Sequence, residues 1–168
     1  EAFMSDLVKT KEEFRVACAE IGARKKNLEE AKRLCASAER EFRAAEPKSA
    51  QLFYKLVSAD NGVRDADWVL REAYLKGLQK LEELSEVDSD VIGGEAKELK
   101  EINVEIREVL RLRGEVMKKI SIILHIIVSD DDENAKEQLS ACLSELGGIS
   151  KRYKETICHG QEIFDKHF

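Results

Sequence analysis

Apolar side chains recur at every seventh residue through the first quarter of the chain. This set is Leu7, Phe14, Ile21, Leu28, Cys35 and Phe42, and the residues three positions further on are Thr10, Ala17, Arg24, Ala31, Ala38 and Ala45. A seven-residue repeat with two apolar positions is typical of a helix that packs along one seam against another helix. We therefore expect a helix of about 40 residues, or ~60 Å. It should end at Glu46-Pro47, because a residue before proline avoids the helical conformation.

A second seam follows, with steps of four and three residues. It consists of Leu52, Leu56, Ala59, Val63, Ala66, Leu70, Ala73, Gly77, Leu81 and Leu84. The seam continues without a slip across Asn61-Gly62, a dipeptide that elsewhere favours a turn. We expect one continuous or slightly bent helix from Pro47 or Ser49 to about Val87. A short break at Asp60–Gly62 is the alternative.

The two seams complement each other if the chain folds back at Pro47. The facing pairs are then Ala38 with Leu56, Ala31 with Val63, Leu28 with Ala66, Ile21 with Ala73, Ala17 with Gly77 and Phe14 with Leu81. A large residue faces a small one in most of these pairs, so the helix axes can approach closely. A parallel dimer of the first helix would instead place alanine on alanine. The pattern predicts an antiparallel αα-hairpin over about residues 4–88.

The second half of the chain predicts another, shorter hairpin over about residues 95–167. Turn-forming residues occupy Asp88–Gly94, and an acidic turn at Ser129–Glu133 separates helices of about Glu95–Val128 and Asp131–His167. The seams are Leu99, Ile102, Ile106, Val109, Arg113, Val116, Ile120, Ile123 and Ile127, and then Leu139, Cys142, Leu146, Ile149, Tyr153, Ile157, Gly160 and Phe164. Gly147-Gly148 could kink the last helix.

The predicted fold class is all-α: an elongated antiparallel helical bundle of two long αα-hairpins, with four helices and coiled-coil-like packing. We expect the two hairpins to dock and to form a single domain over residues 1–168. Charged residues make up 37% of the chain and there is one proline, a composition typical of long helices. The chain begins at Glu1, so we expect it to be a fragment of a longer protein.

Charge and hydropathy narrow the possible partners and location. The net charge of -6 argues against nucleic acid as the main partner, because phosphate binding needs a basic field. The most apolar stretch, Ile120–Val128, is too short for a transmembrane helix, which needs about 20 apolar residues. The four cysteines are Cys18, Cys35, Cys142 and Cys158, and none forms a CxxC pair. We expect them to be buried, reduced thiols of a cytoplasmic or nuclear protein.

No pattern of catalytic or metal-binding residues emerges. A calcium loop that began at Asp130 would need glycine and glutamate where the chain has Ala135 and Ala141. The three histidines lie at no metal-binding spacing, and the glycine pair Gly93-Gly94 lacks the lysine and serine of a phosphate loop. We therefore expect a protein that is not an enzyme and that uses no cofactor.

Surplus apolar surface predicts an interface with other proteins. The second helix carries an extra apolar stripe of Phe53, Val57, Trp68, Leu75 and Leu78, and the third helix is apolar nearly all round at Ile120–Val128. A helix that is apolar all round needs several neighbours. The candidate partner or oligomer interface is Trp68, Leu75, Leu78, Ile122, Leu124 and Ile126.

Basic residues on the third helix suggest a second surface. Lys100, Arg107, Arg111 and Lys118 recur at steps of seven, four and seven, which places them on one face. They are either a solvated face balanced by nearby acids or a stripe for an acidic partner, an anionic lipid or a microtubule. Two arginines, Arg24 and Arg113, occupy seam positions, where we expect them to set the register of packing.

These features predict a protein–protein interaction or scaffolding module that binds through helix–helix contacts and can form a homodimer. The motivating observations are continuous seams, surplus apolar surface and the lack of site chemistry. The alternative is a dimeric bundle of BAR type that associates with anionic membranes or cytoskeletal surfaces, for which the basic stripe is the only support. That comparison is one of shape alone.

Overall fold

The computed structural model describes residues 2–130 and 132–168, and the side chains from Met4 onward within those ranges. Four long helices make up most of it: α1 (Ala2–Ala44), α2 (Ala50–Val87), α3 (Ala96–Asp130) and α4 (Glu133–His167). A short 3₁₀ helix, η1 (Gly93–Glu95), precedes α3, and the described residues contain no β-strand. The predicted all-α fold class is confirmed. Within the same ranges, no helix has a stretch long and apolar enough to cross a membrane.

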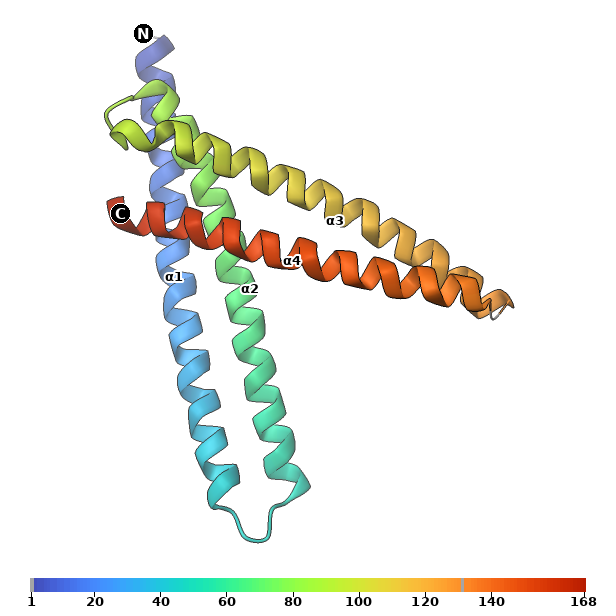
Figure 1. The fold of residues 1–168 in the computed structure, drawn as a ribbon. Helices are drawn as coiled ribbons and strands as arrows, with labels where there is room; N and C mark the ends of the chain where they lie inside the picture. Colours follow the sequence, from blue (N-terminus) through green and yellow to red (C-terminus); the bar gives the residue numbers. More distant parts are fainter. Residues whose placement is uncertain (1, 131) are drawn as a thin grey trace. The chain divides into compact units, whose positions relative to one another are not determined.

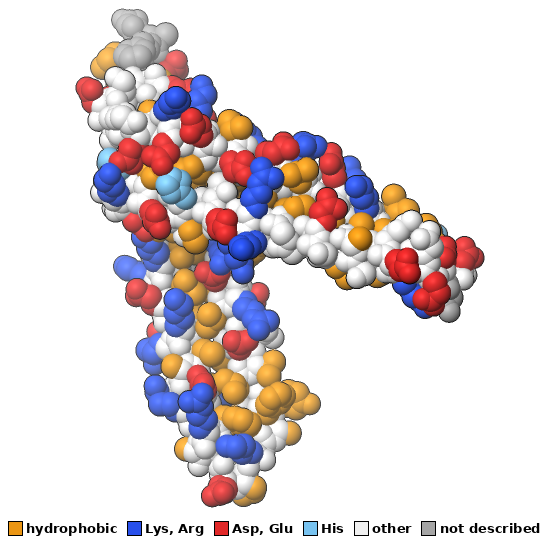
Figure 2. Space-filling model, viewed as in Figure 1, with side chains coloured by type: hydrophobic (Ala, Val, Ile, Leu, Met, Phe, Trp, Pro, Cys, Tyr) orange, Lys and Arg blue, Asp and Glu red, His pale blue; other side chains and the backbone are white. Residues whose placement is uncertain are grey.

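The chain divides into two compact units, one of residues 1–91 with Phe168 and one of residues 92–167. In each unit two long helices run antiparallel and side by side, α1 with α2 and α3 with α4 (Figure 1). Both predicted αα-hairpins are thereby confirmed. Acidic and basic side chains are mixed on the visible surface of both hairpins, with apolar side chains between them (Figure 2).

Polar side chains fix where α1 ends and α2 begins. The Oγ of Ser49 accepts a hydrogen bond from the Leu52 backbone N–H at 3.2 Å, which satisfies one of the unpaired donors of the first turn. The Lys48 ammonium donates to the Phe42 carbonyl at 2.9 Å, so a cation lies at the negative end of the α1 dipole. The predicted start of α2 at Ser49 is confirmed. The helix is also continuous through Asn61-Gly62.

Ion pairs near both ends of the first hairpin are consistent with the predicted register. Near the turn, Lys55 Nζ lies 2.7 Å from Glu41 Oε2. Far from the turn, Lys80 Nζ lies 3.1 Å from Glu13 Oε2. The buried seam residues of this hairpin are Phe14, Ala17, Ile21, Leu28, Ala38, Leu70, Ala73, Gly77, Leu81 and Leu84. Most of the seam near the turn is half-buried, because a seam between only two helices is open to water on both sides.

A cluster of buried aliphatic residues joins α3 to α4. Its members are Val109, Val116, Ile120, Ile123, Ala135, Cys142 and Ile149, with Leu112, Ile127, Leu139, Leu146 and Tyr153 packed against them. The seam follows the predicted positions except at Arg113. Arg113 is exposed and Leu112 packs on the cluster in its place, because a guanidinium buried between two helices loses its hydration. The other seam arginine, Arg24, is half-buried, with Nη2 3.9 Å from Glu20 Oε1.

The connection between α3 and α4 is shorter than the acidic turn that the sequence predicts. α3 continues to Asp130 and α4 begins at Glu133. Asp131, where we expected the last helix to start, lies outside the described residues. The Oδ1 of Asp132 accepts the backbone N–H of Asn134 at 2.9 Å, so a carboxylate caps the positive end of α4 as predicted.

Replacing Gly62 by alanine is expected to stabilise the first hairpin. Gly62 lies inside α2, and a Cβ built on it would meet no atom within 4 Å outside its own helix backbone. Alanine loses less backbone entropy on folding, which corresponds to about 0.5–1 kcal/mol. The matched control is Gly93, whose φ is +57°, so Gly93→Ala is expected to destabilise by about 1 kcal/mol. Urea unfolding followed by circular dichroism measures both, and a lower free energy of unfolding for Gly62→Ala would contradict a continuous α2.

Candidate functional site

The residues on either side of a seam residue lie on opposite faces of the hairpin. Successive residues turn by about 100° around a helix axis, so positions directly before the seam share one face and positions directly after it share the other. A groove of about 370 Å³ between α3 and α4 illustrates this. Its lining includes Lys119 and Ile122 from α3 and Gln138 and Ala141 from α4, all of which directly precede a seam residue. Since the helices are antiparallel, positions directly after the seam share the opposite face.

Over a long stretch the face after the seam is uncharged apart from Arg113, which directly follows Leu112, and we call it the uncharged face. It consists of Leu110, Gly114, Met117, Ser121, Leu124 and Val128 on α3, and of Ser140, Leu143, Gly147 and Ser150 on α4, all of them exposed. The α3 members follow one another at steps of four and three residues, which is the spacing of a helix-packing seam. They span about 27 Å of helix.

Large apolar side chains are exposed to solvent on this face. The exposed fraction is 40% for Leu110, 46% for Met117, 45% for Leu124, 52% for Leu143 and 86% for Val128. Burying the exposed half of one such side chain would contribute about 1 kcal/mol. Single exposed apolar residues are ordinary, but a contiguous row of them marks a surface that gains from a partner.

Glycine lies at two interior helix positions of the uncharged face. A Cβ built on Gly114 or on Gly147 would meet no atom within 4 Å outside its own helix backbone. Glycine inside a helix costs about 1 kcal/mol relative to alanine, and packing within this hairpin gives no reason for it. The close approach of a helix from outside would give one. α4 nevertheless continues as one helix through Gly147-Gly148.

Opposite charges border the two ends of the uncharged face. Arg107 and Lys154 take the positions directly after the seam at the end nearer the start of α3. Asp132 and Glu133 stand at the other end, beside the turn. Lys136 lies there as well, with its Nζ 3.1 Å from Glu133 Oε1. One end is therefore basic and the other is mainly acidic.

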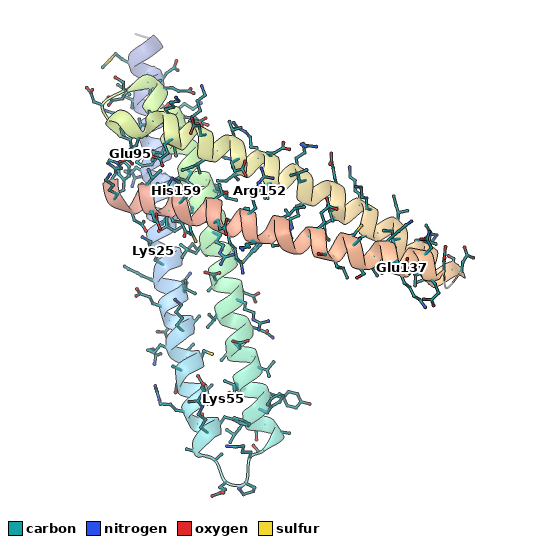
Figure 3. The ribbon with its side chains drawn as sticks, in the orientation of Figure 1. Lys25, Lys55, Glu95, Glu137, Arg152 and His159 are labelled. Carbon is teal, nitrogen blue, oxygen red and sulfur yellow. The ribbon has the colours of Figure 1, made fainter. Side chains whose placement is uncertain are left out.

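The opposite face is acidic toward the start of α3. A groove of about 360 Å³ is lined by Glu98, Glu101, Ile102, Glu105, Glu155, Thr156 and His159. His159 Nε2 lies 2.5 Å from Glu98 Oε1. Arg152 makes two contacts with the Glu105 carboxylate, one of them at 3.0 Å, and Figure 3 labels Arg152 and His159 on α4. We interpret these pairs as contacts that hold α3 and α4 in register. The described residues include no group of three His, Cys, Asp or Glu side chains that could hold a metal ion.

The α2 half of the predicted partner interface is mostly withdrawn from water. Leu78 has an exposed fraction of 0% and Leu75 is half-buried, so within this chain they offer less free surface than Trp68. α2 has more apolar residues than its seam needs, and some residues of its second apolar stripe are also buried. Trp68 is 45% exposed, and its indole N–H donates to Glu72 Oε1 at 3.0 Å.

The α3 half of that predicted interface is divided between two faces. Ile122, Leu124 and Ile126 are all exposed. Leu124 belongs to the uncharged face, whereas Ile122 and Ile126 directly precede seam residues and lie on the opposite face. The nearly continuous apolar run of this helix conceals the division, because it supplies apolar residues on every side.

The predicted basic stripe is exposed but partly neutralised. Lys100, Arg107, Arg111 and Lys118 are all accessible to water. Arg111 is held between two carboxylates, with Nη2 2.6 Å from Glu108 Oε1 and Nη1 2.6 Å from Glu115 Oε1. The hydrogen bond to Glu108 raises the pKa of Arg111. Around Arg111 the stripe therefore resembles a solvated face with balanced charges more than a basic surface.

The four cysteines are free thiols in different environments. Cys142 is buried, Cys18 and Cys35 are half-buried, and Cys158 is exposed. The expectation that all four are buried is therefore wrong for Cys158, which directly follows a seam residue and so points away from the seam. Burial raises the pKa of the Cys18 thiol.

Most of the uncharged face lies outside the predicted interface, although the sequence contains a signal for it. Shifting the α3 seam by one position gives a second row at the same spacing, from Leu110 to Val128.

Comparisons with protein families, with curated proteins and with solved structures find no match for this chain. The surface chemistry of the hairpins is therefore what bears on function.

Acid is expected to weaken the contact between η1 and α4. The Glu95 carboxylate lies 2.5 Å from Lys166 Nζ and 3.2 Å from His167 Nε2. The hydrogen bond from Lys166 lowers the pKa of Glu95 below its ordinary value of 4.5. A carboxyl group with a lowered pKa stabilises the fold above its ordinary pKa, and this contribution is lost as the pH falls through the lowered value.

The melting temperature of the unchanged protein is therefore expected to exceed that of Glu95→Gln above pH 4.5, and the gap should close as the pH falls further. Thermal unfolding at a series of pH values measures the gap. Glu137→Gln, at an exposed position of α4 (Figure 3), is the control. Equal gaps for the two variants at every pH would contradict the role of Glu95.

Proposed function

We propose that this chain is a non-catalytic protein-binding module that receives a helix of a partner protein on its uncharged face. The observation that carries the proposal is the row of exposed apolar side chains at Leu110, Met117, Leu124 and Val128, with Arg113 as the charged residue beside it. Binding of this kind needs apolar area and shape, and no catalytic group.

The spacing of the face supports a helix as the bound element. Steps of four and three residues match the repeat of a second helix that lies alongside, as in a coiled coil. By the register that Arg152 and Glu105 set, Gly114 lies roughly across from Gly147, and Ser121 roughly across from Ser140. Two shallow hollows, separated by Met117, would then accept large side chains spaced seven residues apart on a partner helix.

A protein partner fits this face better than a membrane does. Membrane-surface helices present bulky apolar and aromatic residues to the lipid, whereas half of the uncharged face is glycine and serine and none of it is aromatic. The basic stripe that would favour an anionic membrane is weakened where Glu108 and Glu115 hold Arg111. Small residues favour the close approach of a helix.

The proposal includes a scaffolding role and a cytoplasmic location. A rigid helix face binds without first ordering a loop, which lowers the entropic cost of association. Four free thiols are compatible with a reducing compartment.

Site-specific photo-crosslinking in the cells that make the protein tests the proposal. The photoreactive amino acid p-benzoylphenylalanine is placed at Ser121 on the uncharged face or, as the control, at Glu115 on the opposite face. Adducts heavier than the 19.1 kDa chain are expected from position 121 and not from position 115. Met117→Lys in the same chain is expected to remove them, because it places a charge in the apolar row.

Two outcomes would count against a protein-binding face. One is the same adducts from both positions, or none from position 121. The other is binding to anionic vesicles in co-sedimentation at low salt that Met117→Lys leaves intact and Arg107→Glu abolishes, which would favour the membrane surface instead.

A further inference from the structure

The uncharged face is complementary to itself. We infer that a second copy of this chain docks on it, with α3 of one copy antiparallel to α3 of the other. This inference rests on the proposed function, since it names the helix that the same face receives.

Shape complementarity determines one register for this pairing. When the two-fold axis passes beside residue 119, Leu110 faces Val128 of the second copy, Gly114 faces Leu124, and Met117 faces Ser121. A large side chain of the second copy thus fills the hollow at Gly114 and the hollow at Ser121, and Leu110 meets the smaller Val128. Interdigitation of large with small residues lets helix axes approach closely.

Other antiparallel registers fit less well. Moving the axis so that Met117 faces itself puts Leu110 on Leu124, which places large residues on large ones. A register in which Leu110 faces Ser121 puts Leu124 against Arg107 and breaks the uncharged row. The register centred at residue 119 is therefore preferred.

The charges at the ends of the face favour the same arrangement. Arg107 lies about 18 Å along α3 from the position of the axis, and the turn with Asp132 and Glu133 lies about as far on the other side. The two-fold axis therefore brings the basic end of each copy toward the acidic end of the other. A parallel arrangement would place Arg107 beside Arg107 and acid beside acid.

The dimer would also explain why glycine occupies position 114. A Cβ there would meet no atom of this chain within 4 Å outside its own helix backbone, but Leu124 of a second copy would occupy that space. In a helix interior the absence of a Cβ costs about 1 kcal/mol, which the contact with Leu124 would offset.

The size of the face sets the strength of the association. A footprint of about 27 Å along two helices, each about 10 Å wide, covers roughly 540 Å² per copy. That is below the approximately 800 Å² per partner of a standard stable interface. The dimer should therefore be reversible and dependent on concentration.

Sedimentation velocity of the full chain, up to about 200 µM, tests the inference. The mass is expected to rise toward twice 19.1 kDa with concentration. Gly114→Leu and Met117→Lys are each expected to weaken the dimer at least about tenfold, by filling the hollow and by burying a charge. Gly114→Leu raises helix propensity, so its effect cannot come from loss of the helix.

The matched control is Ile122→Lys, at a position that is 63% exposed on the opposite face. It is expected to leave the dimer unchanged. Circular dichroism verifies that each variant keeps its helix content. A dimer that survives both Gly114→Leu and Met117→Lys would overturn the inference, because it would use another surface.

Salt provides an independent check of the arrangement. Arg107→Glu turns the attraction to the acidic turn into a repulsion, so this variant is expected to dimerise more weakly than the unchanged protein at low salt. Sodium chloride screens that contact, so the difference in dissociation constant between the two proteins should shrink as salt is added. Equal dimerisation of the two proteins at low salt, or a difference that salt does not reduce, would overturn the antiparallel arrangement.

The failure of this inference is distinguishable from the failure of the proposed function. A chain that stays monomeric at every concentration, but whose position 121 crosslinks to a different protein, overturns the dimer and leaves the protein-binding face in place. A monomer with no crosslink at position 121 removes both.

Discussion

The packing of large on small residues between antiparallel helices is the interaction on which the rest of this structure depends. In the first hairpin Ala17, Ile21, Ala73 and Gly77 are all buried along one seam, and small residues in a seam allow helices to pack closely and to make many dispersion contacts. A seam between two helices covers only one stripe of each. All positions outside the seam are exposed to water or available to a partner, so the residues that flank the seam determine the chemistry of the surface.

The α3–α4 hairpin uses its two flanks in different ways. On the flank before the seam, Glu105 with Arg152 and Glu98 with His159 connect the helices. Exposed ion pairs contribute at most about 1 kcal/mol each, so their main effect is to favour one register and one direction of approach. On the flank after the seam, Arg113 is the charged residue between Leu110 and Val128, and the large side chains there are apolar. A face that exposes so much apolar area is a net cost to an isolated hairpin, which is why it supports a role in binding.

Glycine and serine give this face a character that apolar area alone would not. Leucine at position 114 would extend the apolar row and improve the helix, yet the chain has glycine in a place where its own atoms leave open space. A helix face with both projections and hollows is selective, because a partner must match their spacing as well as their polarity. The rigidity of a continuous α3 maintains that spacing without the cost of ordering a loop.

Periodicity in the sequence determined the helices, the two hairpins, the start of α2 at Ser49 and its continuity through Asn61-Gly62, because each of these depends on residues that are neighbours along the chain. The tertiary structure decided that Leu112 replaces Arg113 at the seam, that Leu78 is buried, and that Leu124 and Ile126 lie on opposite faces. It also decided which carboxylates of α3 meet Arg152 and His159 of α4. A repeat of three and four residues specifies a stripe on a helix only to within about one residue, or 100°. Which neighbour of that stripe faces the other helix depends on how the two axes cross, and only the packed pair contains that information.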